Sequence, residues 1–193
     1  MATLAELAAI AAQCTRCPLA ESRTTVVFGA GDEKAPLMFV GEAPGRDEDL
    51  TGLPFVGRSG KLLDELMLSE LGVTRERCFI ANTVKCRPPA NRDPSAFEIE
   101  SCRPYLEGQL DLVAPKVVIT LGNFATKLLL LGDPAAKEGI TKLRGKTYPW
   151  RGAVLVPTFH PAAALRSGGE TLAGMRADFV RAKQALIAAG VAW

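Results

Sequence analysis

Four short apolar runs divide the chain, and they constrain its fold more than any other feature. The runs are LMFVG (37–41), CFIAN (78–82), VVITLG (117–122) and AVLVPT (153–158). Helix-like segments separate or follow them, at residues 59–72, 93–112, 123–132 and about 171–189. Because strands that alternate with helices need crossover connections, the pattern favours a mainly parallel sheet with helices on both faces. We therefore predict an α/β fold, a three-layer α/β/α sandwich around a four-stranded central sheet.

The length of the chain and its N-terminal segment predict one soluble domain. With 193 residues, 48% of them hydrophobic, the chain can bury one core but is short for two, so we expect a single domain over residues 1–193. The first residues lack the basic start of a secretion signal and include Glu6, which is typical of an amphipathic helix instead. Since no apolar stretch approaches the roughly 20 residues of a membrane span, we expect a cytoplasmic protein without a membrane partner.

Four of the five cysteines are spaced like metal ligands. Cys14 and Cys17 form a C-x-x-C pair, and Cys86 and Cys102 follow much later in the chain. In a reducing compartment, such cysteines are candidates for metal binding before disulfides. Four thiolates hold either a zinc ion or an iron–sulfur cluster, and the spacing alone does not decide between them. Cys78 lies within an apolar run and is assigned to the core.

Polar residues follow each of the four predicted strands. In a parallel sheet, a ligand site forms beyond the carboxyl ends of the strands. Those ends carry Glu42, Asn82, Asn123 and His160. We therefore expect one cleft to collect these four side chains.

Glycine and proline crowd the segment after the first strand, GEAPGRDEDLTGLPFVGRSG (41–60). The segment has neither the G-x-G-x-x-G spacing of a dinucleotide site nor the G-K-S/T of a P-loop, so we exclude both. It offers a backbone that a ligand can approach closely, and one ring, Phe55, held between Pro54 and Gly57. Such a ring suits stacking on a planar ligand; the alternative is that Phe55 packs in the core.

A basic segment and the only histidine lie close together in the last third of the chain. Between Glu138 and Glu170 there is no acidic residue, while five basic residues occur there, with Tyr148 and Trp150 interleaved. Such a segment is typical of a surface that follows a phosphate backbone, despite the net charge of +2, and equally of a solvated loop. His160 stands at a predicted strand end before a helix-like AAALR, where an imidazole can donate a hydrogen bond to an anion.

Taken together, these loops resemble one known family. The segments GEAPGRDEDLTGLPFVGRSG, NTVKCRPPANRDP and FHPAAALR, with the four spaced cysteines, are similar to the iron–sulfur (family 4) uracil-DNA glycosylases. The match extends from Cys14 to Arg166, and the motifs in this order are highly specific. The resemblance implies the uracil-DNA glycosylase fold and a [4Fe–4S] cluster on Cys14, Cys17, Cys86 and Cys102.

The same resemblance implies an activity. A monofunctional DNA glycosylase hydrolyses the N-glycosidic bond of uracil in DNA and leaves an abasic site, as the first step of base excision repair. The implied partner is uracil-containing DNA, single- or double-stranded, bound by a monomer. The uracil must leave the base stack to reach the enzyme. The free energy of this extrusion is smallest where the uracil is poorly paired.

Roles for single residues in uracil binding follow from the resemblance. Phe55 would stack on the uracil ring, while Asn82 would read its O4 and N3–H edge. His160 would donate a hydrogen bond to uracil O2 as negative charge grows there. Gly41 and Asn91 are further candidates for substrate binding, and the role of Asn91 is unassigned.

The group that orients water is less closely defined. Glu42 is the implied carboxylate, either for water or for stabilising the sugar cation. The related family with G-Q-D-P-Y in this loop uses an aspartate that aligns with Ala43 here, which leaves Asp47, Glu48 and Asp49 as alternatives.

Three residues are candidates for DNA binding. The segment HPAAALR would enter the minor groove, with Leu165 or Arg166 filling the gap left by the flipped base. Lys85 is a further candidate for a DNA contact. The family often has serine at the position of Ala162. Alanine has no hydroxyl group, so this chain lacks one possible phosphate contact.

Two other classes of function fit parts of the pattern. A related branch binds uracil-DNA without turnover, or traps it covalently through a histidine in a basic insertion after the second motif. The corresponding stretch here, CRPPANRDP, contains no histidine. The second alternative is an iron–sulfur redox protein in which the sheet is only a scaffold. Release of uracil from DNA distinguishes the enzyme from both.

Overall fold

The sheet has four parallel strands at its centre and a short antiparallel strand at each edge. In the computed structural model, which describes residues 3–191, the parallel strands are β2 (Leu37–Gly41), β3 (Phe79–Asn82), β4 (Val117–Leu121) and β6 (Ala153–Thr158). The edge strands are β1 (Ala30–Gly31) and β5 (Tyr148–Trp150). Across the sheet the order is β1-β3-β2-β4-β6-β5. The four predicted strands are confirmed, whereas β1 and β5 are too short to produce a periodic pattern.

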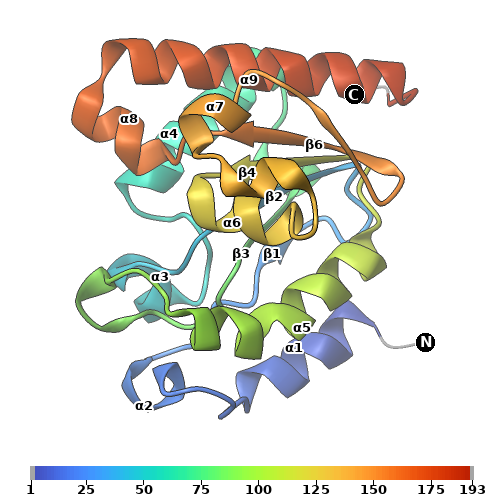
Figure 1. Cartoon of the computed structure of the whole chain (residues 1–193). Coiled ribbons are helices and arrows are strands. Elements are labelled where there is room, and N and C mark those ends of the chain that lie inside the picture. The colour runs from blue at the N-terminus through green and yellow to red at the C-terminus, as the bar shows by residue number, and fades with distance from the viewer. Residues whose placement is uncertain (1–2, 192–193) are drawn as a thin grey trace.

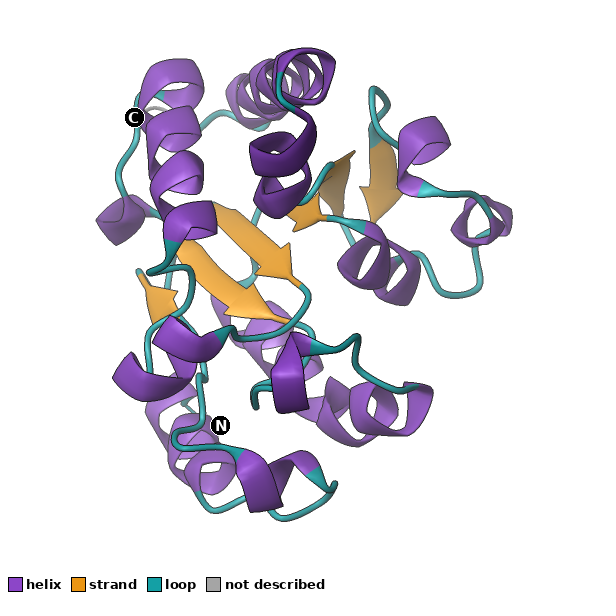
Figure 2. Ribbon diagram, turned by 90° about the vertical axis from the view of Figure 1, so that its left-hand side faces the viewer, coloured by secondary structure: helices purple, strands orange, loops and turns teal. Residues whose placement is uncertain are grey.

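Nine α-helices surround the sheet within the described residues. They are α1 (Leu4–Ala12), α2 (Leu19–Ser22), α3 (Arg46–Thr51), α4 (Arg58–Leu66), α5 (Ala96–Val113), α6 (Asn123–Leu129), α7 (Ile140–Leu143), α8 (Pro161–Ser167) and α9 (Gly169–Ala188). A π-helical turn, Met67–Leu71, extends α4, and short 3-10 turns lie at Arg75–Arg77, Pro89–Asn91 and Pro134–Lys137. Figure 1 shows α9 along one side of the sheet and α1 and α5 along the other, and Figure 2 shows the strands between them.

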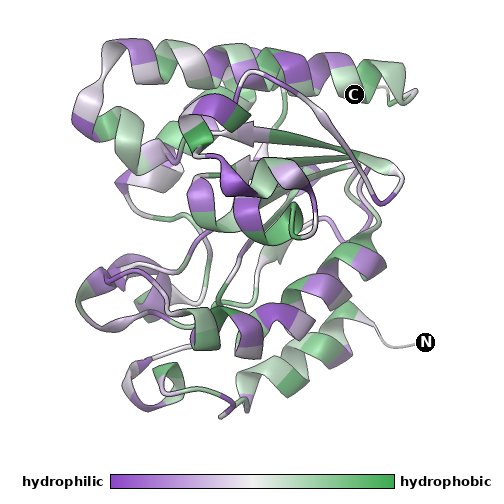
Figure 3. Cartoon of the chain, viewed as in Figure 1, coloured by the Kyte–Doolittle hydropathy of each residue, from purple (hydrophilic) through white to green (hydrophobic). Residues whose placement is uncertain are grey.

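The central strands are buried on both faces, which explains why their sequences are continuously apolar. Every residue of β2, β3 and β4 is buried. Leu37 and Phe39 face a core shared with α4 and α9, while Met38 and Val40 face the core shared with α5. The apolar colouring of the strands in Figure 3 follows this arrangement. The three-layer sandwich predicted from the sequence is therefore confirmed, with six strands in place of four.

Capping residues decide where the helices begin. Ser95 accepts a hydrogen bond from the Glu98 N–H, and the Glu98 carboxylate accepts one from the Ser95 N–H, so α5 starts three residues after the predicted boundary. Gly57 and Gly122 occupy the N-cap positions of α4 and α6, so these helices begin at Arg58 and Asn123. Among residues 3–191, no helix is both long enough and apolar enough to cross a membrane.

Candidate functional site

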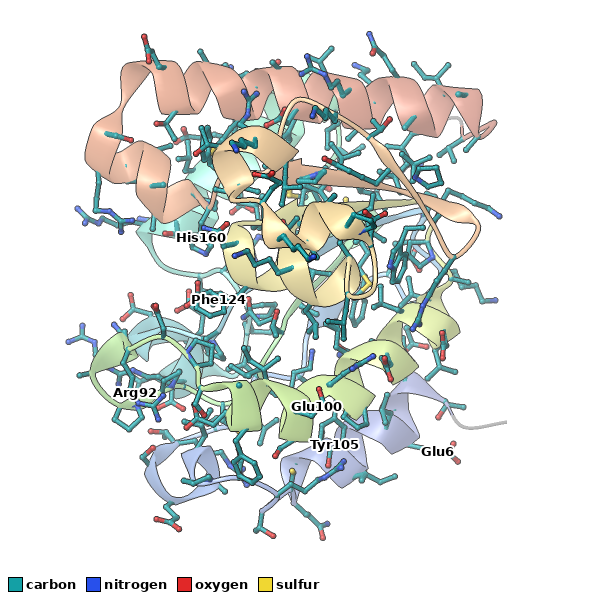
Figure 4. The ribbon with its side chains drawn as sticks, in the orientation of Figure 1. Glu6, Arg92, Glu100, Tyr105, Phe124 and His160 are labelled. Atoms are coloured by element: carbon teal, nitrogen blue, oxygen red, sulfur yellow. The ribbon has the colours of Figure 1, made fainter. Side chains whose placement is uncertain are left out.

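A cavity of about 440 Å³ lies at the carboxyl ends of the parallel strands. Three of the four side chains expected there line it: Glu42 after β2, Asn82 at the end of β3 and His160 after β6. In Figure 4, His160 lies on the same side of the molecule as Arg92, which lines the opposite wall of the cavity. The cavity is also lined by Phe55, Glu48, Asn91, Asp93 and Arg166. Asn123 is absent from the lining, since its Oδ1 accepts a hydrogen bond from the Ile140 N–H at 2.8 Å, and its expected place in the cleft is wrong.

Main-chain hydrogen bonds hold the ends of β2 and β3 together. The Thr83 N–H and hydroxyl both donate to the Gly41 carbonyl at 2.9 Å, and the Val84 N–H donates to the Glu42 carbonyl at 3.1 Å. A Cβ on Gly41 would lie 2.4 Å from Asn82 Oδ1 and 2.6 Å from Phe55 Cζ. Position 41 therefore requires glycine, because the Asn82 amide and the Phe55 ring occupy the space that a side chain would need.

Asn82 presents an unpaired polar atom to the cavity. The residue is 2% exposed, and its Oδ1 is buried without a hydrogen-bond partner. Leaving such an acceptor unpaired costs about 1–3 kcal/mol, so groups of this kind are rare in folded proteins. An acceptor that the protein leaves unsatisfied in a cavity is suited to a ligand that donates a hydrogen bond.

Phe55 is held in a backbone conformation that only a few non-glycine residues adopt. Its φ is 53° and its side chain is buried. The Arg75 guanidinium donates hydrogen bonds to the carbonyls of Phe55 and, at 2.9 Å, Pro54, and its Nε lies 2.5 Å from the Asp64 carboxylate. Arg75 therefore stabilises the turn that points the ring into the cavity. Arg75 is 20 residues away from Phe55 in the chain and belongs to no motif, so the sequence alone does not indicate this contact.

His160 caps the helix that follows it. Its Nδ1 accepts a hydrogen bond from the Ala162 N–H at 3.1 Å, so a neutral ring carries its proton on Nε2. Burial, and secondarily the charge of Arg166, lower the pKa of His160 to about 4. The His160 and Phe55 rings lie 5.8 Å apart, centroid to centroid, on one wall of the cavity. At neutral pH this imidazole is an uncharged hydrogen-bond donor.

Glu42 faces a second carboxylate. Burial, followed by the charge of Asp93, raises the pKa of Glu42 to about 7. No hydrogen bond to its carboxylate is present among the described contacts, in contrast to the alternatives proposed from the sequence. Glu48 accepts hydrogen bonds from the N–H groups of residues 45, 56 and 57, and Asp49 accepts them from residues 24 and 25. Both of those carboxylates maintain loop structure, and Asp47 lies 3.4 Å from Arg46 and outside the cavity lining, so Glu42 is the one of these four without a described partner.

The remaining candidates surround the opening of the cavity. Asn91 has a φ of 52°, and its Oδ1 accepts a hydrogen bond from Arg87 Nε at 2.7 Å, which leaves its NH₂ group available to a ligand. Leu165 and Arg166 are exposed on α8, and Arg166 reaches the cavity. The expected contacts of these residues with substrate and DNA stay predictions.

Lys85 is not on the surface, and the prediction that it contacts DNA is wrong. Its side chain is 1% exposed, and its Nζ donates hydrogen bonds within the protein. Burial lowers the pKa of Lys85 to about 8, while negative charge on Cys102 and Cys86 acts in the opposite direction. The motif NTVKCRPP suggested a basic loop, but Lys85 points inward, since its backbone continues the buried end of β3.

The four cysteines predicted as ligands come together from three parts of the chain. Cys14 and Cys17 lie between α1 and α2, Cys86 follows β3, and Cys102 is in α5. All four line one small cavity, and no described cysteine forms a disulfide. Within residues 3–191, no three His, Cys, Asp or Glu side chains surround the position of a single ion. Cys78 is buried in the core, as predicted.

Donors and burial define the environment of these thiols. Arg23 Nη1 donates to Cys86 Sγ at 3.4 Å, and the Lys85 N–H donates to Cys102 Sγ at 3.2 Å. Burial raises the pKa of Cys102 to about 11 and also raises those of Cys17 and Cys86. Thiols in such surroundings become thiolates when a metal supplies the opposing positive charge.

Two arginines of the basic segment, Arg144 and Arg151, form ion pairs with acidic residues from distant elements. Arg144 contacts the buried Asp178 of α9 at 2.8 Å, and Arg151 lies 3.6 Å from both Glu107 and Asp111 of α5. No carboxylate lies between Glu138 and Glu170 in the sequence, but the fold brings carboxylates from other elements next to these two arginines. Two of its five basic residues are therefore paired with other elements of the fold, whereas Lys142, Lys146 and Arg166 remain exposed.

Comparison with known proteins gives a consistent result. Residues 28–186 match the family model of the uracil DNA glycosylase superfamily. The chain is 49% identical to the type-4 uracil-DNA glycosylase of Sulfurisphaera tokodaii, over 79% of this chain and 71% of that protein. It is 45% identical to the type-4 uracil-DNA glycosylase of Saccharolobus solfataricus, over 90% of this chain and 82% of that protein. The type-4 uracil-DNA glycosylase of Thermotoga maritima is also 45% identical, over 83% of this chain and 82% of its own length.

Proposed function

This chain belongs to the type-4 branch of the uracil-DNA glycosylase superfamily, and we propose that it hydrolyses the N-glycosidic bond of uracil in DNA. The product is an abasic site, so the protein is a monofunctional hydrolase of base excision repair. The observation that carries the proposal is the buried Oδ1 of Asn82, which has no partner and lies in a cavity beside the Phe55 ring. Every site role below is part of this proposal.

Uracil recognition rests on the amide of Asn82. Uracil offers a donor at N3–H and an acceptor at O4, and the Asn82 side chain offers the complementary acceptor and donor. Cytosine has a lone pair at N3, which would face Oδ1 and leave both acceptors buried and unpaired. Sites of this kind reject the wrong ligand by about 10⁴–10⁵-fold. Phe55 stacks on the flat face of the base, and the cavity of about 440 Å³ is large enough for an extruded base.

His160 stabilises the leaving base. As the glycosidic bond breaks, the bonding electrons move to uracil, and negative charge grows on O2. The Nε2–H of the neutral imidazole donates a hydrogen bond to that oxygen, because Nδ1 is already occupied by the Ala162 N–H. A neutral donor suits this step, since it needs no deprotonation when the product leaves.

Glu42 acts on the sugar side of the bond. Its carboxylate is free of hydrogen bonds from the protein among the described contacts, and its raised pKa of about 7 makes it a better base than an ordinary glutamate. It accepts a proton from the attacking water, whose oxygen bonds to C1′ of the deoxyribose. Its negative charge also stabilises the cationic character that develops on the sugar.

The four cysteines fit an iron–sulfur cluster. They are free of disulfides, largely shielded from solvent and approached by two N–H donors, which favour charge on sulfur. We propose that Cys14, Cys17, Cys86 and Cys102 hold a [4Fe–4S] cluster. When bound, it supplies a crosslink between the α1–α2 region, the end of β3 and α5, and a redox-active centre. Iron and acid-labile sulfide per chain, with the cluster absorbance, test this assignment.

DNA binds across the opening of the cavity. Leu165, which is 46% exposed near the end of α8, would fill the gap left by the flipped base, and Arg166 would contact a phosphate. We propose further that residues 1–193 form one domain that acts as a monomer in the cytoplasm. Packing of α1 on α5 and of α9 on β4 and β6 supports a single domain. Size-exclusion chromatography with light scattering tests the monomer.

The decisive experiment uses a labelled duplex with one U·G pair. After incubation with the purified protein, alkali cleaves the strand wherever a base has been lost, and a C·G duplex is the control. We expect cleavage only at uracil and only after alkali. An intact strand with retained tight binding would instead support a uracil-DNA binding protein, and an intact strand without binding would support a redox protein. The Asn82→Ala variant should lose preference for uracil over cytosine.

A further inference from the structure

A buried lysine connects the uracil cavity to the cysteine group. Lys85 Nζ donates to the carbonyl oxygen of Asn82 at 2.7 Å and to Gln109 Oε1 at 2.6 Å. Gln109 is fully buried in α5, and its Nε2 donates to the Phe28 carbonyl at 2.7 Å. The lysine therefore holds the main chain at the residue whose amide lines the cavity, and ties it to the helix that carries Cys102.

The charge of Lys85 lacks a carboxylate partner. Among residues 3–191, it forms no ion pair with aspartate or glutamate. A buried ammonium needs opposite charge nearby, because neutral acceptors replace only part of its hydration. The nearby groups that become anionic when they ligate a metal are Cys86 and Cys102, and the main-chain N–H of Lys85 donates to Cys102 Sγ at 3.2 Å. If these cysteines ligate a cluster as thiolates, they supply the negative charge that the Lys85 ammonium otherwise lacks.

We propose that Lys85 is a positioning residue for base release: its ammonium balances the cluster thiolates and fixes the main chain at Asn82, and with it the amide that binds uracil. This inference rests on the proposed function, in both the role of Asn82 and the cluster on the four cysteines. Through Lys85, the cysteine group helps to position Asn82, although the hydrolysis itself transfers no electrons. The five-residue segment from Asn82 to Cys86 is the physical connection.

Two substitutions separate the charge of this link from its hydrogen bonds. Lys85→Met removes the charge and both donor contacts but keeps a side chain of similar length. Gln109→Met removes one acceptor of Lys85 and the donor to the Phe28 carbonyl, and it keeps the charge. Lys116→Met is the matched control, because Lys116 is exposed before β4, at the end of the sheet away from the cavity. All proteins are compared as holoproteins at equal iron and sulfide content.

The readouts are single-turnover uracil release with enzyme in excess and the reduction potential of the cluster. For Lys85→Met, we expect the saturating rate constant to fall about 10- to 100-fold, since small misplacement of a binding group costs this much. The enzyme concentration at half-saturation should stay unchanged, and the potential should become more negative, because a positive charge next to the cluster is lost. Gln109→Met should slow release less and leave the potential unchanged. Lys116→Met should match the wild type in both.

Several results would overturn the inference. One is a Lys85→Met holoprotein with the wild-type rate constant and potential. Another is an unchanged rate constant with weaker and less salt-dependent DNA binding, which is the result of losing a direct phosphate contact. If Lys85→Met does not accumulate with its cluster, Gln109→Met decides, and an unchanged rate constant there contradicts the link. A wild-type protein that releases no uracil contradicts the proposed function instead, and the potential of Lys85→Met still tests the charge of the link.

Discussion

The uracil cavity and the cysteine group share the segment from Asn82 to Cys86 but satisfy their polar groups in opposite ways. In the cavity, Asn82 Oδ1 has no partner, and Phe55 is held at a φ of 53°. Around the cysteines, N–H groups approach the sulfur atoms and burial shields the thiols. The cavity contains a strained backbone and an unpaired acceptor, which a ligand can bind, whereas the thiols are shielded from solvent and approached by donors from the protein. A substitution in one region should therefore act on catalysis, and in the other on folding.

The largest effect is expected from Cys86→Ala. Loss of one ligand removes the crosslink between the N-terminal region and the sheet, and should lower the free energy of unfolding by more than about 4 kcal/mol. Chemical denaturation and iron content measure this. Cys78→Ala is the matched control, because it deletes a buried thiol outside the group and should retain full iron. Equal free energies of unfolding for the two variants would show that the cysteine group does not crosslink the N-terminal region to the sheet.

Glu42→Gln should slow uracil release by about 10³-fold without changing stability, because a neutral amide neither accepts the proton of water nor stabilises a cation. Single-turnover kinetics on U·G duplex measures the rate constant. Glu65→Gln, an exposed glutamate on α4, is the control and should behave as the wild type. Retained activity in Glu42→Gln would move the role to another group, with Asp93 the first to test.

His160→Ala should slow uracil release by about 10²–10³-fold, the usual cost of losing one donor to a developing anion. The same change removes the cap of α8 and should cost about 1 kcal/mol of stability. His160→Asn keeps a side-chain acceptor at this position, so it should recover the stability but not the rate. Recovery of the rate by asparagine would indicate that the imidazole acts only through the helix.

Arg75→Met should slow release about tenfold, because the Phe55 turn loses the donors that stabilise it and the ring moves from its stacking position. Fluorescence-based binding of uracil-DNA and single-turnover kinetics together detect this change. The cluster content should not change. If stability falls while the rate constant at saturating enzyme is preserved, Arg75 supports the fold and not the position of the ring.

The smallest change is expected from Asp93→Asn. In the wild type, the rate constant should fall about tenfold per pH unit below about pH 7 and level off above it, because Glu42 acts as a carboxylate and its pKa is raised to about 7. Removing the negative charge of Asp93 lowers the pKa of Glu42, so the midpoint should move to lower pH. A midpoint at the wild-type value would show that burial alone raises the pKa.

The sequence by itself determined the four parallel strands, the set of four spaced cysteines that gather at one place, and the meeting of Glu42, Asn82 and His160. Apolar periodicity is a local property, and parallel topology places all strand ends at one edge, so these features need no knowledge of packing. Partners between distant segments were decided only by the tertiary structure. Arg75 supports Phe55, and Asp93 faces Glu42. Acidic residues of α9 and α5 pair with Arg144 and Arg151, two of the five basic residues of a segment without carboxylates.

Lys85 shows the physical reason most clearly. Its motif indicated a surface cation, yet it is buried between Asn82 and Gln109. The direction of a long side chain depends on which polar groups the packed elements bring within reach. Residue type and spacing established which groups are present, and only the folded chain established which of them are paired, buried or left open for the substrate.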